Sequence, residues 1–187
     1  MSVEKTRTQR LATTGVIAAT YAAFSVIAMQ TLSMFAWGPV QFRVSEALVI
    51  LPLFFAEAVP GLAIGCLLAN LANIAMASTG AIGLLDVVFG TLATLLGALW
   101  TRRFRQHPGI ALAGPVVTNA IIVAAYLPII LKGLGYYTIP FTTIALDGSG
   151  YLALFLFGVI SVGIGEAVVV YALGLPLAAL LKRALKL

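Results

Sequence analysis

Apolar runs approaching or exceeding the length of a membrane-spanning helix dominate this chain and leave little sequence between them. A spanning helix needs about 17–25 predominantly apolar residues. Six such runs lie near Leu11–Phe35, Val44–Val59, Gly61–Ala77, Leu84–Trp100, Ile110–Leu131 and Tyr151–Leu181. Only 9% of the residues are charged, whereas a soluble domain carries about 25%. The sequence therefore predicts an all-α integral membrane protein in which residues 1–187 form one transmembrane domain of six helices.

Prolines and glycines predict where these helices are interrupted. Pro60 and Gly61 predict a tight turn between the short second and third runs. Pro52 lies inside the second run and predicts a kink there. The last run is longer than one perpendicular span needs, so we expect it to tilt, to kink at Pro176 or to continue along the interface.

The distribution of lysine and arginine predicts the orientation, because cytoplasmic loops of membrane proteins are enriched in these residues. With six spans, nine of the eleven basic residues share one side: Lys5, Arg7, Arg10, Arg102, Arg103, Arg105, Lys182, Arg183 and Lys186. The other two, Arg43 and Lys132, fall on the opposite side. Both termini are therefore expected in the cytoplasm. This sorting also accounts for the net charge of +5, so no nucleic acid partner is expected.

Residue patterns typical of common enzymatic sites are absent from the sequence. The single histidine, His107, lies in a basic loop, and the single cysteine, Cys66, lies within an apolar run, so neither predicts a metal site. No glycine-rich loop ends in Lys-Ser or Lys-Thr, so no nucleotide-phosphate cradle is expected. We expect neither an enzyme nor a bound cofactor, and a step driven by ATP would require another subunit.

Ionisable and amide side chains inside the apolar runs mark the candidate substrate site, because such residues are costly in hydrocarbon. At about 1.5 Å of rise per residue, the predicted outer half of the membrane holds Glu46, Asp86, Glu166, Asn73 and Tyr126, and Asn119 lies near mid-depth. The outer loops add Trp37, Gln41, Arg43 and Tyr137. Glu166 is the first candidate, since its own helix offers it no cationic neighbour.

Each of these residues also has a structural interpretation. Arg43 and Glu46, three residues apart, are placed to form an ion pair, and Asp86 is placed to cap a helix. The asparagines are suited to hydrogen bonds between helices. Trp37 and Tyr137 fit the aromatic belt of a membrane interface.

The first apolar run carries small residues at a regular spacing. Gly15, Ala19 and Ala23 recur every four residues, and Ala18 and Ala22 lie beside them. Small residues at this spacing let another helix approach closely. The neighbour is either another helix of this chain or a partner protein.

Four stretches carry a resemblance to a known family: VQFRVSEALVILPLFF, VPGLAIGCLLANL, GLLDVVFGTLATLLGALWTRR and GEAVVVYALGLPL. With the six runs and the polar residues, they resemble the substrate-binding S components of energy-coupling factor (ECF) transporters. They are most similar to the QueT family of queuosine-precursor transporters. The blocks around Arg43–Glu46 and Asp86 are the distinctive ones. The family often has Thr-Pro after Leu-Pro-Leu, where this chain has Phe54–Glu57, so the resemblance gives Glu57 no role.

The resemblance implies a binding subunit in a prokaryotic plasma membrane that captures a 7-deazaguanine queuosine precursor from outside. The implied partners are a transmembrane coupling subunit and two ATPase subunits, and toppling in the membrane would deliver the substrate inward. A carboxylate suits the N1–H and exocyclic amine of such a base, and an asparagine suits its carbonyl. Trp or Tyr would stack on the ring. A second carboxylate would suit a cationic aminomethyl substituent. Residues Gln41–Glu46 are then expected to form part of a lid and rim.

Two other functions remain open from the sequence. One is an S component for another small molecule, such as biotin or thiamine. The other is a membrane scaffold protein that uses its first helix to hold partners. The carboxylates in the predicted outer half favour a transporter, because scaffolding gives no reason for them.

Overall fold

The structure, a computed structural model, describes residues 6–31, 42–77, 79–139 and 142–185. Five of its helical stretches are long and apolar enough to cross a membrane: Arg7–Thr31, Ala58–Met76, Gly80–Arg103, Pro108–Gly133 and Tyr151–Leu185. A sixth helix, η1 (Val44–Leu53), is apolar but shorter. The predicted all-helical class is thereby confirmed for these residues, while the second predicted span differs.

The second predicted span is a short, buried 3₁₀ helix followed by a turn at residues 54–57. At about 2.0 Å of rise per residue, ten 3₁₀ residues reach about 20 Å, which is less than the roughly 30 Å of hydrocarbon. Pro52 lacks the N–H that an α-helix would use, and β-branched Val49 and Ile50 restrict the helical rotamers. Val49 and Ile50 are fully buried, so η1 is part of the core.

The third helix begins earlier than the sequence suggests. α3 (Ala58–Ala77) includes Pro60 in its first turn, where the backbone N–H groups have no partner within the helix. The tight turn predicted at Pro60–Gly61 is therefore wrong, because the chain has already turned at residues 54–57. The N–H of Gly61 donates a 3.1 Å hydrogen bond to the carbonyl of Glu57.

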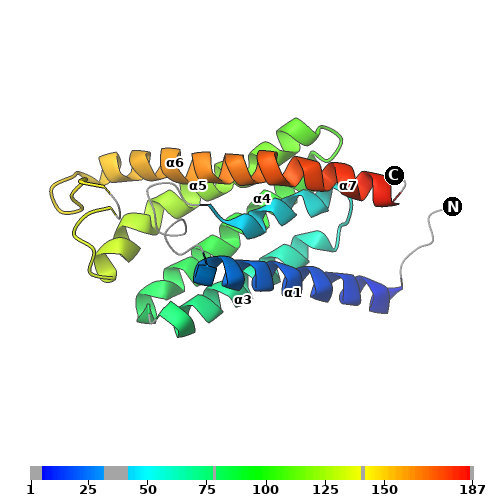
Figure 1. The fold of residues 1–187 in the computed structure, drawn as a ribbon, viewed down its shortest axis with the longest axis horizontal. Helices are drawn as coiled ribbons and strands as arrows, with labels where there is room; N and C mark the ends of the chain where they lie inside the picture. Colours follow the sequence, from blue (N-terminus) through cyan, green and yellow to red (C-terminus); the bar gives the residue numbers. More distant parts are fainter. Residues whose placement is uncertain (1–5, 32–41, 78, 140–141, 186–187) are drawn as a thin grey trace.

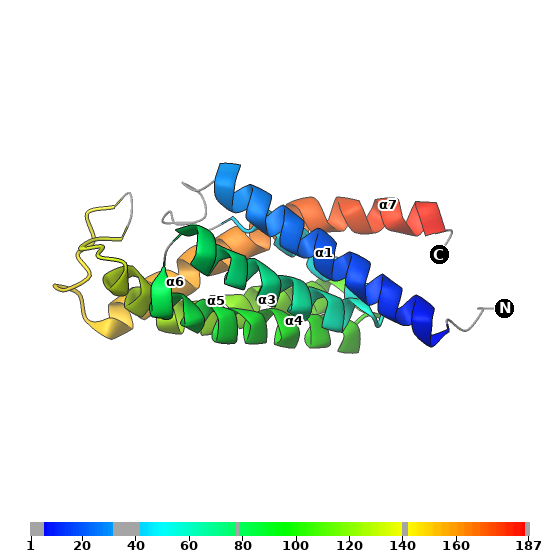
Figure 2. The same cartoon turned by 90° about the horizontal axis from the view of Figure 1, so that it is seen from below.

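Helix α1 (Arg7–Thr31) lies along α3, and two glycines of α3 make the contact possible (Figure 2). A Cβ atom on Gly65 would lie 2.7 Å from the carbonyl oxygen of Ala18 and 2.8 Å from Cβ of Tyr21. One on Gly61 would lie 2.9 Å from Cγ2 of Ile17. The Gly-x-x-x-Gly spacing therefore brings the α1 backbone close, as in other membrane helix pairs.

The next two helices form an antiparallel pair. The chain continues through η2 (Gly80–Gly83), the π-helical η3 (Asp86–Gly90), α4 (Thr91–Arg103) and α5 (Pro108–Gly133). Gly97 faces Pro115 at this contact, and Gly114 faces the ring of Trp100. Asp86, the first residue of the π-helical turn η3, is one of the predicted site residues.

The carboxyl-terminal part is one long, nearly continuous helical rod (Figure 1). It comprises α6 (Tyr151–Ala167), the π-helical η4 (Val168–Gly174) and α7 (Leu175–Leu185). The irregular segment ends just before Pro176, whose ring would clash with the preceding turn of a regular helix. Gly174 lets this rod approach η1, since a Cβ atom there would lie 2.8 Å from Cγ2 of Ile50.

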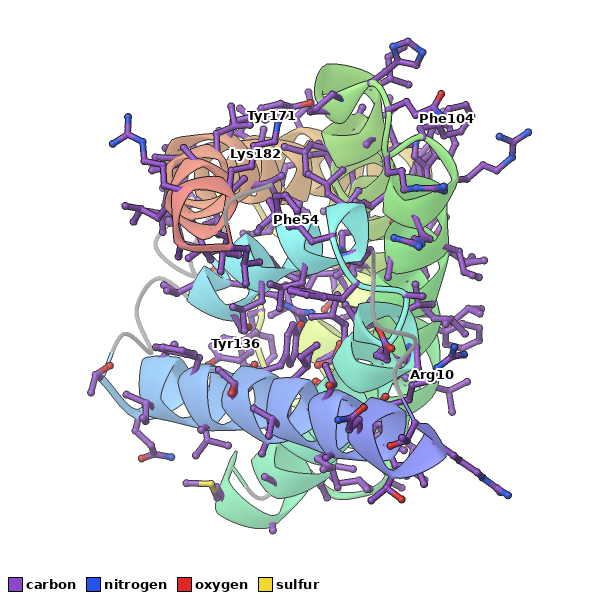
Figure 3. All side chains as sticks on the ribbon, turned by 90° about the vertical axis from the view of Figure 1, so that its right-hand side faces the viewer. Arg10, Phe54, Phe104, Tyr136, Tyr171 and Lys182 are labelled. Atoms are coloured by element: carbon purple, nitrogen blue, oxygen red, sulfur yellow. The ribbon has the colours of Figure 1, made fainter. Side chains whose placement is uncertain are left out.

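The start of α1 and the end of α7 lie at the same end of the bundle as the loop between α4 and α5 (Figures 1 and 3). The described basic residues of these segments are Arg7, Arg10, Arg102, Arg103, Arg105, Lys182 and Arg183. The grouping inferred from the sequence is thus present in the fold, while its cytoplasmic assignment stays a prediction. At the other end, Lys132 is 2.9 Å from the Asp147 carboxylate.

Large apolar side chains cover the outside of the long helices. The most exposed include Leu11, Val16, Ile27, Leu152 and Ile160, each with more than half of its surface accessible. An apolar surface of this extent would promote aggregation if it were exposed to water. The hydrocarbon core of a lipid bilayer is a suitable solvent for it. The chain is therefore a multi-pass membrane protein.

Candidate functional site

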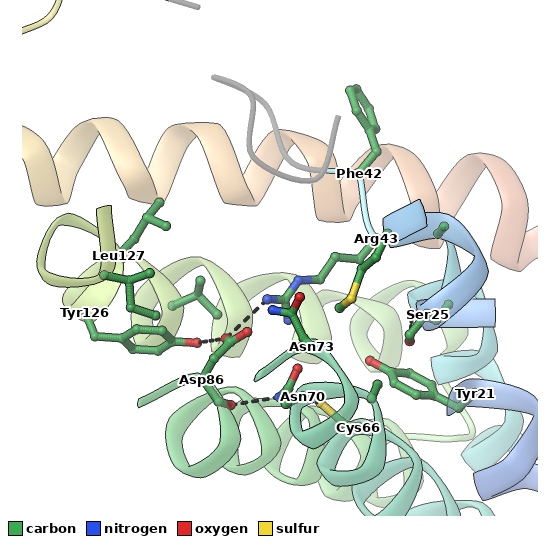
Figure 4. Close-up of a pocket in the computed structure, with 16 residues that line it drawn as sticks. Tyr21, Ser25, Phe42, Arg43, Cys66, Asn70, Asn73, Asp86, Tyr126 and Leu127 are labelled. Carbon is green, nitrogen blue, oxygen red and sulfur yellow. Dashed lines mark hydrogen bonds and ion pairs between the residues drawn. The ribbon is translucent and has the colours of Figure 1, made fainter. Parts of the chain in front are cut away.

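A pocket with polar side chains at both ends and a largely apolar wall opens between the second half of α1, the start of η1, α3, the segment before α4 and the second half of α5 (Figure 4). Its cavity volume is about 60 Å³, and the empty space reaches about 750 Å³ only when the open space at its mouth is included. Its lining comprises Tyr21, Ser25, Ala28, Met29, Phe42, Arg43, Ser45, Cys66, Ala69, Asn70, Asn73, Asp86, Val123, Tyr126, Leu127 and Ile130. The pocket therefore belongs to the half of the bundle away from the basic loops.

Asp86 organises one end of the pocket. Its Oδ1 atom accepts a 2.6 Å hydrogen bond from the hydroxyl of Tyr126 and lies 3.4 Å from Nη2 of Arg43. Its backbone carbonyl accepts a 2.8 Å hydrogen bond from Nδ2 of Asn70. A π-helical turn changes the regular backbone pairing and is frequent at functional sites. The network thus joins α3, η3, α5 and the segment before η1 around one carboxylate.

A glycine makes room for this network. A Cβ atom on Gly90 would lie 2.9 Å from Oδ1 of Asp86, 3.1 Å from Nδ2 of Asn70 and 3.2 Å from the hydroxyl of Tyr126. Gly90 ends η3, one turn after Asp86. The close approach of three polar groups therefore depends on the absence of a side chain there.

Two asparagines of α3 share one face of that helix. Asn70 and Asn73 are three residues apart and both line the pocket. Both are buried. Their amides face Asp86 and Arg43 in Figure 4, which provides both donors and acceptors at this end of the pocket.

Hydroxyl groups organise the opposite end. The Ser25 hydroxyl donates a 2.7 Å hydrogen bond to Oγ of Ser45, which joins α1 to η1. The Tyr21 hydroxyl donates to Oε1 of Glu46. Tyr21, Ser25 and Ser45 line the pocket, whereas Glu46 lies directly behind Tyr21. Among the described residues, Oε2 of Glu46 has no hydrogen-bond partner.

The ion pair considered between Arg43 and Glu46 is wrong, because each side chain has a different partner. Arg43 precedes η1 with an extended backbone, φ −93° and ψ 90°, and its guanidinium reaches Asp86. Glu46 lies within η1 and meets Tyr21 of α1. The cap proposed for Asp86 is also wrong, since its side chain bonds Tyr126 and Arg43 rather than the helix start.

Glu166 and Asn119 form a separate buried pair. Nδ2 of Asn119 donates a 3.1 Å hydrogen bond to Oε1 of Glu166, which joins α5 to α6. Both side chains are almost fully buried, and neither lines the pocket. The first candidate of the sequence interpretation thus lies beside the site rather than in its wall, because its face of α6 turns to α5.

The remaining predicted residues are less central. Tyr137 is 81% exposed, in the loop after α5, and does not line the pocket. Trp37 and Gln41 fall outside the described residues. The binding roles assigned to all these side chains stay predictions.

Tyr21, Ser25, Ser45, Cys66 and Asn70 line the pocket but were not among the predicted site residues. Tyr21 and Ser25 are four residues apart, so a polar stripe on an otherwise apolar helix was a readable signal. Cys66 accepts a 3.3 Å hydrogen bond from the Thr94 hydroxyl. No spacing rule in the sequence indicates that contact.

The small residues of α1 divide between two faces. Gly15, Ala19 and Ala23 are exposed, and a Cβ atom on Gly15 would meet nothing within 4 Å. Ala18 is buried against Gly65 of α3, and Ala22 is partly buried. Only the first three therefore form an open stripe that an external helix can reach.

Comparison with known proteins agrees with the sequence resemblance. The chain is 33% identical over 110 residues to a protein named Queuosine precursor transporter QueT from Lactococcus lactis subsp. cremoris. The aligned part is 56% of this chain and 58% of that relative, so the chain spans under two thirds of the relative's length. No solved structure matches the chain. The profile of the QueT transporter family matches residues 11–183, which is most of the sequence, and the chain belongs to the QueT transporter family.

Proposed function

We propose that this chain is the substrate-binding S component of an ECF importer and that it captures a 7-deazaguanine queuosine precursor from outside the cell. Family membership and the name of the Lactococcus lactis relative support the substrate class. The observation that carries the assignment is the pocket itself. Its lining combines Asp86, Arg43 and Asn73 with a largely apolar wall, and it lies in the half of the bundle away from the basic loops.

The Asp86 end of the pocket suits the polar edges of such a base. A carboxylate oxygen accepts hydrogen bonds from N1–H and the exocyclic amine, and the Arg43 guanidinium donates to a ring carbonyl. Asn73 supplies an amide beside them. Val123, Leu127 and Ile130 provide an apolar wall for the ring faces. The Tyr126 hydroxyl bond holds the Asp86 carboxylate in place.

The exposed face of α1 is proposed to contact the transmembrane coupling subunit. Gly15, Ala19 and Ala23 form an open stripe on it, and small residues permit a close helix contact. The sequence has no phosphate-binding loop of the P-loop type. Two partner ATPase subunits are therefore proposed to supply the energy for inward delivery.

Titration calorimetry of the purified chain tests the proposed substrate class. The ligands are 7-deazaguanines with an aminomethyl or a nitrile substituent and the free base queuine, with biotin and thiamine as the alternatives. We expect saturable binding of at least one 7-deazaguanine and none of either vitamin. Binding of biotin or thiamine alone would assign the chain to a different substrate, and binding of no small molecule would favour a scaffold.

A further inference from the structure

The outer side of α4 carries a stripe of leucines that ends in an arginine. Leu92, Leu96 and Leu99 are 40%, 40% and 47% exposed, and Arg103, in the last turn of the helix, is exposed as well. The successive spacings of four, three and four residues place these four side chains on one face of α4. At about 1.5 Å of rise per residue, the stripe is about 16 Å long. It therefore offers an acyl chain an apolar surface that leads to a guanidinium group.

Trp100 marks the level of the membrane interface on α4. Its indole is 38% exposed, and its Nε1–H donates a 3.1 Å hydrogen bond to the carbonyl of Ile110. The ring also packs against Phe104, with 5.4 Å between the ring centroids, and Figure 3 shows Phe104 at the outer edge of the bundle. Tryptophans of this kind are enriched where hydrocarbon meets headgroups. Because Arg103 and Arg105 follow Trp100 in the chain, they lie at the level of the headgroup phosphates.

The three arginines after Trp100 have different surroundings. Nη1 of Arg102 donates a 3.1 Å hydrogen bond to the carbonyl of Pro52, so this side chain reaches toward η1. Arg103 is exposed, and its guanidinium carbon lies 5.8 Å from the centre of the Phe104 ring. Arg105 is exposed in the loop before α5. A guanidinium carries five N–H donors and matches a phosphate with two parallel hydrogen bonds. Arg103 and Arg105 are therefore the two residues placed to bind a phosphate group.

The charge of this region favours an anionic lipid over a zwitterionic one. The sequence has no acidic residue between Asp86 and Asp147, so neither α4 nor α5 supplies a carboxylate to neutralise these arginines. Helix α5 begins at Pro108, directly after the loop, and the first turn of a helix adds partial positive charge. The choline of a zwitterionic lipid would bring a further cation into this field, whereas a glycerol headgroup would not.

We propose that this outer face of α4 and the loop after it bind an anionic phospholipid. One acyl chain lies along Leu92, Leu96 and Leu99, and the phosphate accepts hydrogen bonds from Arg103 and Arg105. The leucine stripe favours a lipid over an acidic partner protein, because an acyl chain covers the stripe and accounts for its alignment with Arg103. The site lies at the end of the bundle away from the substrate pocket, so the inference goes beyond the proposed function and does not depend on it.

Quenching of tryptophan fluorescence by brominated lipids tests the site at its own position. The sequence has two tryptophans, so Trp37→Phe leaves Trp100 as the single indole. This chain is reconstituted in phosphatidylcholine vesicles with equal amounts of brominated phosphatidylglycerol or brominated phosphatidylcholine. We expect the relative binding constant from quenching to favour phosphatidylglycerol at least about fivefold, which is the effect of one basic residue at an anionic surface. Equal quenching by the two lipids would overturn the inference.

Paired substitutions assign the preference to two arginines. In the Trp37→Phe chain, Arg103→Gln with Arg105→Gln should make quenching by the two lipids equal and leave the thermal midpoint in detergent unchanged. Arg7→Gln with Arg183→Gln removes two exposed charges from the same end of the bundle and should retain the preference.

An equal loss of preference in both pairs would show diffuse attraction to the basic end and overturn the site. A preference that survives Arg103→Gln with Arg105→Gln would do the same. If the parent shows no lipid preference and this pair loses assembly with partner subunits, the arginines bind a protein instead. The comparison of the two lipids on the Trp37→Phe chain decides the proposal even if a paired variant does not fold.

Discussion

Tyr126 of α5 and Asp86 of η3 are joined by a 2.6 Å hydrogen bond from the phenol to Oδ1 of the carboxylate. The same oxygen lies 3.4 Å from Arg43, so three segments far apart in the sequence meet at one atom. This contact fixes the direction of the carboxylate toward the pocket. It also links the stability of the fold to the shape of the site.

Replacing Tyr126 by phenylalanine removes that donor and leaves the ring in place. A hydrogen bond to a charged group contributes about 1.5–3 kcal/mol. We therefore expect Tyr126→Phe to lower the thermal midpoint in detergent and to weaken 7-deazaguanine binding about tenfold or more. Tyr137→Phe, in the exposed loop, is the matched control and should change neither quantity. Parent-like binding by Tyr126→Phe would show that Asp86 needs no such support.

A methyl group on Gly90 should disrupt the site from within. Its Cβ atom would lie 2.9 Å from the Asp86 carboxylate, which must shift, and 3.2 Å from the Tyr126 hydroxyl, which must give by a few tenths of an ångström. We expect Gly90→Ala to abolish measurable ligand binding in calorimetry. Gly109→Ala has open space around its new methyl group and should bind as the parent does. Normal binding by Gly90→Ala would contradict the geometry of this network.

The contact between α1 and α3 should be equally intolerant of added volume. Gly65→Ala would place Cβ 2.7 Å from the Ala18 carbonyl oxygen, and overpacking of this kind costs about 1–3 kcal/mol. We expect a lower thermal midpoint, and weaker binding because Tyr21 and Ser25 lie on the displaced helix. Gly109→Ala again serves as the control. An unchanged midpoint would mean that α1 is free to shift on α3.

The exposed stripe of α1 should act in transport rather than in binding. Ala19→Leu adds bulk on the open face and leaves the buried face that holds Ala18 untouched. We expect uptake by cells that also express the coupling and ATPase subunits to be lost, with calorimetric affinity unchanged. If the variant loses substrate affinity while it still assembles with those subunits, the stripe packs within this chain instead.

Cysteine labelling tests the predicted orientation with little background, because the single native cysteine, Cys66, is buried. In intact cells, an impermeant maleimide should label Asp147→Cys from outside and should not label Arg105→Cys. Permeabilised cells should label both. External labelling at position 105 would refute the orientation with both termini in the cytoplasm.

The helices and the polar end of the pocket were largely predictable from the sequence, because both depend on local periodicity. Asn70 and Asn73 share a face at a spacing of three residues, and both line the pocket. The sequence also placed Asp86 and Tyr126 at similar depth, and the structure brings them into contact. The Gly61–Gly65 spacing was a further signal for close helix packing that the interpretation overlooked.

Other features depend on which way a helix face turns, and depth alone does not determine this. Glu166 is paired with Asn119 across α5 and α6, away from the pocket wall. Arg43 meets Asp86, 43 residues away, rather than nearby Glu46. The 3₁₀ form of η1 arises from packing within the bundle core, so a count of apolar residues predicted an ordinary span there.

The central claim is that Asp86 binds a 7-deazaguanine in this pocket, and titration calorimetry of Asp86→Asn against the parent chain tests it most directly. The amide keeps one acceptor and adds donors that face those of the ligand and of Arg43. Asp147→Asn, an exposed residue with the same change in charge, is the control. The account predicts parent affinity for Asp147→Asn and at least about a tenfold loss for Asp86→Asn. Parent-like affinity for 7-deazaguanines in Asp86→Asn would contradict it.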